Sequence, residues 1–125
     1  MFLDLILKRE GYQESTLILN AIEKTVFDGV VLDITILNID YVAKKQVKEI
    51  KDFLVLINSL FEVVGASNKT IKEALAMPNN DLEDNLQYVC AKHSKSEIII
   101  SNDKNFIKTD IQTLSSREFV ERYLD

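Results

Sequence analysis

The sequence has no tryptophan, and its 125 residues include only one proline, three glycines and one cysteine. So little proline and glycine argues against a disordered or loop-dominated chain. The single cysteine, Cys90, excludes an intramolecular disulfide and suits a reducing compartment. No apolar run approaches the ~20 residues that cross a bilayer, and the first residues lack a basic leader. We therefore expect a cytoplasmic protein with no membrane partner.

The residues that are present predict one α/β domain covering residues 1–125. The length suits a single domain, and 46% of the residues are hydrophobic, which is enough for a sizeable core. Helical apolar periodicity alternates with short apolar runs. The expected helices cover residues 12–24, 34–45, 46–60, 70–76, 81–93 and 115–124, and the expected strands cover 27–32, 61–64 and 97–100. This alternation predicts a three-layer α/β/α fold around a mostly parallel sheet.

Helix starts are indicated by short polar residues followed three positions later by glutamate, the spacing of a capping box. The pairs with this spacing are Thr70 with Glu73, Asn80 with Glu83, and Ser115 with Glu118. Each pair stands just before or within a stretch that favours helix. We expect a helix to begin at each of them.

The charge distribution bears on the type of ligand. A net charge of −5 is unfavourable for a protein that grips nucleic acid through phosphate contacts alone. It is compatible with an enzyme whose bound divalent cations supply the positive charge. Four lysines cluster at Lys44, Lys45, Lys48 and Lys51. A solvated helix face is the simpler interpretation of that cluster, with phosphate binding as the alternative.

An aspartate follows the apolar strand expected at residues 97–100. In parallel α/β folds, ligands sit at the carboxyl ends of the strands, which is where Asp103 falls. A carboxylate at that place suits a hard cation. The alternative is a turn formed by the Asn102-Asp103 pair.

Two further acids begin the helix expected at residues 81–93. Asp81 and Asp84 are three positions apart and therefore adjacent on one helix face, opposite a face of apolar side chains. Neighbouring carboxylates repel, so clustering them calls for a cation or a raised pKa. Stabilisation of the helix dipole is the alternative, and it explains Asp81 better than Asp84. On an earlier helix, the amide of Asn38 is a weaker candidate ligand, with a solvated side chain as the alternative.

Other kinds of site find little support. The chain has no Cys/His zinc spacing, no P-loop and no glycine-rich dinucleotide loop. His93 and Cys90 fall on the side of their helix that also carries Leu82, and we expect Cys90 to pack in the core and His93 to be a packed or boundary residue in place of a ligand. Tyr41 and Tyr88 could stack on a base, but core packing is the simpler role.

Five segments resemble, in order and spacing, those of a PIN domain of the VapC-like toxin type. The segments are FLDLILKREGYQES (2–15), TILNIDYV (35–42), DLEDNLQYVCA (81–91), SNDKNF (101–106) and SSREFVERYL (115–124). The third is the most specific match. The resemblance covers nearly the whole chain and agrees with the predicted α/β/α fold.

The resemblance implies a metal-dependent ribonuclease that hydrolyses RNA phosphodiesters with Mg²⁺ or Mn²⁺. It also implies an antitoxin protein as partner and, commonly, a homodimer. The implied site consists of Asp84 and Asp103 as metal-binding carboxylates, Asp81 as an auxiliary carboxylate, Asn38 in a position often held by Glu, and Ser101 and Thr35 in supporting roles.

The sequence departs from the family pattern at its start. The first strand of the family ends in Asp-Thr-Asn, and this sequence has no such motif. We expect the chain to begin downstream of that strand, to lack the first metal-binding aspartate, and to have weak or no activity as written. The alternative function is a non-catalytic PIN-like module for protein interactions. A receiver-like phosphoacceptor domain is disfavoured because its paired acids and its lysine are missing.

Overall fold

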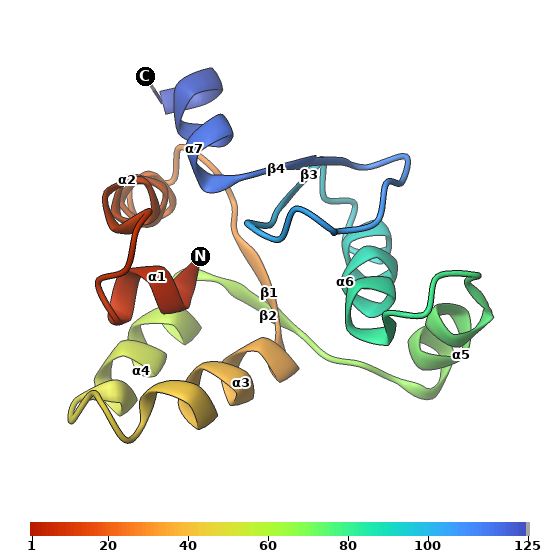
Figure 1. Ribbon diagram of the computed structural model, residues 1–125, viewed down its shortest axis with the longest axis horizontal. Coiled ribbons are helices and arrows are strands. Elements are labelled where there is room, and N and C mark those ends of the chain that lie inside the picture. Colours follow the sequence, from red (N-terminus) through yellow and green to blue (C-terminus); the bar gives the residue numbers. More distant parts are fainter. Residues whose placement is uncertain (125) are drawn as a thin grey trace.

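The computed structural model describes residues 1–124 (Figure 1). In chain order the elements are α1 (Phe2–Ile6), α2 (Tyr12–Glu23), β1 (Val30–Leu32), α3 (Asp33–Ala43), α4 (Ile50–Leu60), β2 (Glu62–Val64), α5 (Asn68–Ala76), α6 (Leu82–His93), β3 (Ile98–Ile100), β4 (Gln112–Leu114), α7 (Ser116–Phe119) and a π-helical turn (Val120–Leu124). No helix within residues 1–124 is long and apolar enough to cross a membrane.

The helices predicted from apolar periodicity are present, with shifted ends. The predicted helix at 46–60 begins only at Ile50, because residues 44–49 form the turn that lets α4 pack back on α3. Ile50 and Ile57, two turns apart, are the buried residues of α4. Burial of this one face, more than helix propensity, holds a helix of this length in place.

The predicted helix starts are confirmed at one site and displaced at two. At α7, the Ser115 hydroxyl accepts the N–H of Glu118 (3.1 Å), and the Glu118 carboxylate accepts the N–H of Ser115 (2.9 Å). At α5 the cap is Ser67 and not Thr70, and at α6 it is Asp81 and not Asn80. Several short polar residues precede these two helices. The start falls on the one whose oxygen reaches the N–H three residues on.

The parallel strands of the predicted α/β fold form two separate pairs. In one pair β1 lies parallel to β2, with Val31 opposite Val63, and in the other β3 lies parallel to β4, with Ile99 opposite Thr113. The sequence analysis did not predict β4. This strand has three residues, its first residue is exposed, and it lacks the apolar run that marks β3.

A cavity of about 700 Å³ lies between the two strand pairs. It is lined by β1 and β3 together with side chains of α2 and α6, including Ile18 and Cys90. The hydrophobic core is accordingly divided into clusters. One cluster joins Leu32 to α5 and α6, and another joins Ile18 to α7 and β4. The loops that follow the strands carry the polar residues considered next.

Candidate functional site

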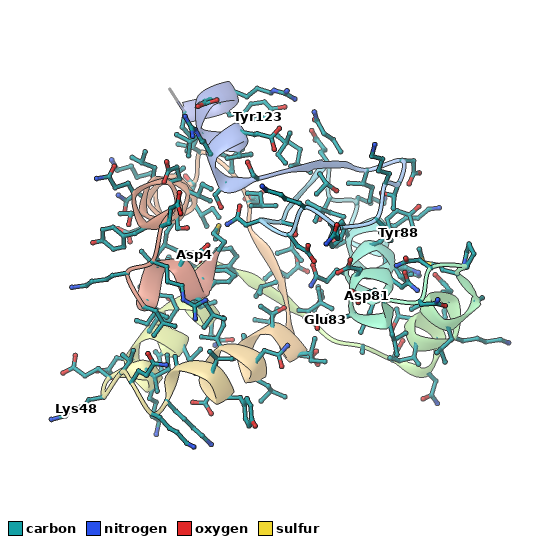
Figure 2. The ribbon with its side chains drawn as sticks, in the orientation of Figure 1. Asp4, Lys48, Asp81, Glu83, Tyr88 and Tyr123 are labelled. Atoms are coloured by element: carbon teal, nitrogen blue, oxygen red, sulfur yellow. The ribbon has the colours of Figure 1, made fainter. Side chains whose placement is uncertain are left out.

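The start of α6 brings a buried carboxylate next to other acids. Asp84 is only 7% exposed, although it is charged. Burial raises the pKa of Asp84, and the neighbouring charges of Asp81, Asp103 and Glu83 raise it further, against a backbone hydrogen bond from Ile107. Figure 2 shows Asp81 and Glu83 beside α6. The structure thus places the charges of Asp81, Asp103 and Glu83 within electrostatic range of Asp84.

Asp81 has a structural task as well. Its carboxylate accepts the N–H of Asp84 at 3.1 Å and so caps α6. The capping role that the sequence analysis weighed as an alternative is therefore real for Asp81. Asp84 lies in the first turn but is buried, as a simple helix-dipole acid would not be.

Asp103 is exposed in the loop after β3, and its own turn orders it. The Ser101 hydroxyl accepts the N–H of Asp103 (3.2 Å), and the Asp103 carboxylate accepts the N–H of Asn105 (2.9 Å). Ser101, to which the family resemblance gives a supporting role, holds the backbone of Asp103 through its hydroxyl.

Asn102 braces the same loop and was overlooked in the sequence. Its amide nitrogen donates to the Asp4 carboxylate (3.0 Å) and to the Ser116 hydroxyl (3.1 Å), and its amide oxygen accepts the N–H of Ser116 (2.9 Å). The loop is therefore tied to α1 and α7. Its position next to Asp103 was the available signal, but the partners lie far away in the sequence.

α3 reaches the acidic group through Asn38. The Asn38 amide donates to the Glu83 carboxylate at 3.5 Å, which places this predicted residue at the edge of the group. Glu83 had been interpreted only as the partner of an N-cap. Thr35, one turn earlier on α3, is half-buried and lines the central cavity.

The remaining expectations for α6 are partly corrected. Cys90 is buried as predicted, but Leu82 is 41% exposed and His93 is exposed, with its Nε2 2.9 Å from the Glu73 carboxylate. Both lie at the ends of α6, where less of the fold covers the helix. Tyr88 donates to the Asp110 carboxylate at 2.5 Å, which ties α6 to the loop before β4. The Tyr88 hydroxyl is thereby engaged, and the residue is half-buried.

The carboxylate oxygens of these acids suit a hard divalent cation, but the acids are not closely grouped. Mg²⁺ and Mn²⁺ prefer carboxylate oxygens, and a cation would offset the neighbouring charges that raise the pKa of Asp84. Within residues 1–124, however, no group of three or more His, Cys, Asp or Glu residues stands close enough to hold a metal ion. The arrangement therefore offers one buried carboxylate, Asp84, with further acids around it.

Asp84→Asn is expected to stabilise the protein in EDTA at neutral pH. The pKa of Asp84 is raised in the folded state, so ionising this group costs stability. That cost is absent below the ordinary value of 3.8 and complete above the raised value. The Tm of the variant should exceed that of wild type by a few degrees at about pH 8 and converge with it at about pH 4.

The control for this variant is Asp28→Asn, which removes an exposed acid from the loop before β1. It should leave the Tm within about 2 °C of wild type at both pH values, as surface substitutions do. If Asp84→Asn and wild type have the same Tm at about pH 8, the claim that ionised Asp84 destabilises the folded protein is wrong.

Comparison with known proteins identifies the family of the chain. Residues 1–105 match the family model of the PIN domain. Ribonuclease VapC1 of Aquifex aeolicus (strain VF5) is 34% identical over 85 residues, which are 64% of this chain and 56% of that protein. The chain thus spans about half the length of this curated relative, and no solved structure matches at a significant level. Because the family match covers most of the sequence, the chain belongs to the PIN domain family.

Proposed function

We propose that the protein is a metal-dependent ribonuclease of the VapC toxin type that hydrolyses RNA phosphodiesters. Membership of the PIN domain family and similarity to a protein named Ribonuclease VapC1 support this function. The observation that carries it is the buried Asp84 carboxylate beside Asp81, Glu83 and Asp103. A group of carboxylates of this kind repels RNA unless a cation offsets its charge.

In this proposal Asp84 and Asp103 hold a Mg²⁺ or Mn²⁺ ion, with Asp81 as an auxiliary ligand. Such an ion, when bound, activates a water molecule and offsets charge on the phosphate. The chain's own contribution is placement. Asp84 is fixed on a helix, and the Asp103 loop is braced by Asn102 and Ser101. Asn38 orients Glu83, and Thr35 supports the start of α3.

We further propose the surroundings in which this activity would operate. The substrate is RNA, the regulatory partner is a small antitoxin protein, and the toxin acts in the cytoplasm as a single domain that forms a homodimer. The name of the relative supports the ribonuclease and toxin assignment.

Calorimetric titration with MnCl₂ tests the proposed metal site. Because no three acids converge within the described residues, we expect weak but saturable binding, with a Kd of about 10⁻⁴–10⁻³ M, as in weak carboxylate sites. Asp84→Asn and Asp103→Asn should each abolish saturation. Asp28→Asn, the same change at an exposed loop position, should bind as wild type does.

The second candidate function is a non-catalytic PIN-like interaction module. It is favoured by one observation, the absence of a three-ligand group within residues 1–124. A titration in which wild type and Asp84→Asn give the same featureless heat would support this module and contradict the ribonuclease.

A further inference from the structure

α3 carries an exposed aromatic side chain near its end, and exposed lysines follow it in the turn between α3 and α4. Tyr41 is 76% exposed, which corrects the expectation that it packs in the core. The Lys44 ammonium lies 6.0 Å from the centre of the Tyr41 ring. Lys45 and Lys48 are also exposed, and no ion pair involves any of these three lysines in the part of the chain that the structure describes. We call these four residues the Tyr41 surface.

The Tyr41 surface begins one helical turn from the acidic group. Asn38, which contacts Glu83, is three residues before Tyr41 and seven before Lys45. At 1.5 Å per residue the separation of Asn38 and Tyr41 is about 4.5 Å along α3, and residues three apart lie on the same helix face, whereas Lys45 lies in the turn that follows α3. Figure 2 shows Lys48 at the far end of this path from Glu83. A strand held at the acidic group could therefore continue along the Tyr41 surface.

We propose that the Tyr41 surface binds single-stranded RNA next to the acidic group, a proposal that rests on the proposed function. One base stacks on the Tyr41 ring, and neighbouring phosphates contact Lys44, Lys45 and Lys48. Aromatic rings beside lysines are the usual means of holding a single strand without sequence preference, and a duplex offers no free base face to stack. The surface supplies local positive charge on a chain whose net charge is −5.

A protein partner fits this surface less well than RNA. Residues 41–51 contain four lysines and one glutamate, and lysine is depleted in protein interfaces. Leu37, one turn before Tyr41, is 68% exposed, and Ile34 and Val42 on the same helix are each 38% exposed, so α3 also presents apolar side chains, and the light-scattering measurement below tests a protein partner. Unpaired flexible ammonium groups are well suited to phosphates, which they meet as point charges.

Fluorescence anisotropy with a short labelled single-stranded RNA in EDTA tests the proposal without cleavage. Loss of one stacked base costs about 1–3 kcal/mol, so Tyr41→Ala should weaken binding about 5- to 160-fold, whereas Tyr41→Phe should retain it. Each phosphate contact contributes about 0.7 to the slope of log K against log salt, so the double variant Lys44→Gln/Lys45→Gln should reduce that slope by about 1.4. Both changes are at exposed positions and should leave the fold intact.

The matched control is Lys69→Gln/Lys72→Gln, a pair of exposed lysines on α5, which Figure 1 shows on the other side of the molecule from α3. An equal loss of slope in this control, or unchanged binding in Tyr41→Ala, would overturn the proposal. So would a change of oligomeric state in Tyr41→Ala, measured by light scattering, without a change in RNA affinity. Asp84→Asn, which removes a negative charge, should bind RNA at least as tightly as wild type. RNA binding that survives failure of the Mn²⁺ titration would separate this surface from the catalytic proposal.

Discussion

Asn85→Ala is expected to destabilise the protein by about 3 kcal/mol, as measured by urea unfolding. Asn85 is 1% exposed, and its amide nitrogen donates to the backbone oxygens of Asn79 (2.7 Å) and Ala74 (3.1 Å). Its amide oxygen accepts from the Asn79 side chain (3.0 Å). The network ties the end of α5 and the connection after it to α6. Alanine would leave these buried groups without partners and would also leave a small cavity.

The neighbouring amide supplies the control. Asn80 is exposed and no hydrogen bond joins its side chain to the rest of residues 1–124, so Asn80→Ala should change stability by no more than about 0.5 kcal/mol. Asn85→Asp retains the acceptor but loses both donated bonds and buries a charge, so it should be at least as harmful as alanine at neutral pH. If Asn85→Ala and Asn80→Ala unfold at the same urea concentration, the hydrogen bonds of Asn85 do not stabilise the protein as proposed.

The same network bears on the site, because Asn85 follows Asp84 on α6. Loosening the entry to α6 should shift the Asp81 cap and the Asp84 carboxylate together, since the cap is a bond between these two residues. Asn85 contributes no oxygen atom to the acidic group, so we expect it to affect the group only through the position of α6. Fixing ligands through their supporting hydrogen bonds is common in metal sites.

Much of the fold was readable because it depends on repeated local signals. Apolar residues at helical spacing located α2, α3, α4 and α6, and the Ile98–Ile100 run located β3. The Ser115 and Glu118 pair gave the start of α7 because both hydrogen bonds of the box are made within four residues. A structure predicted from a short segment is found in the folded protein unless tertiary contacts oppose it.

The parts that escaped prediction depend on partners distant in sequence. Asn85 and Asn102 look like ordinary polar residues until the chain brings Ala74 to one and Asp4 to the other. Tyr41 was expected to be buried because aromatic residues usually are, yet no segment within residues 1–124 covers it. The division of the strands into two pairs also has no local signal, because pairing is decided across the whole chain.

The candidate site shows the same division. Asp84 and Asp103 were selected because acids after a strand and at a helix start are local features, and the structure brings their charges within range of each other. Glu83 was missed as a member of the group because its spacing from Asn80 had a simpler explanation as a cap. Its place in the acidic group is revealed only by its contact with Asn38, which is 45 residues away in the sequence.

Asp84→Ala is expected to reduce Mn²⁺-dependent cleavage of single-stranded RNA by about 100-fold or more. Residues that merely support metal ligands typically cost ~10- to 100-fold, and Asp84 is proposed as a ligand itself. It is the most buried acid of the group, so no neighbouring carboxylate can take its place without rearrangement. Wild-type turnover should be slow and should require millimolar Mn²⁺, because no three acids converge within residues 1–124.

Gel analysis of end-labelled RNA, with single-turnover rates at saturating and limiting Mn²⁺, measures this effect. Loss of a ligand should lower the rate most at limiting Mn²⁺, which separates it from loss of RNA binding at Tyr41, where the dependence on RNA concentration shifts instead. Asp28→Ala, the same truncation at an exposed loop acid, should cleave as wild type does. Cleavage that EDTA stops but Asp84→Ala leaves intact would place the metal elsewhere. A metal ion bound at Asp84 should activate water even when its affinity is low. Wild-type protein that cuts no RNA at any Mn²⁺ concentration would therefore favour the interaction module.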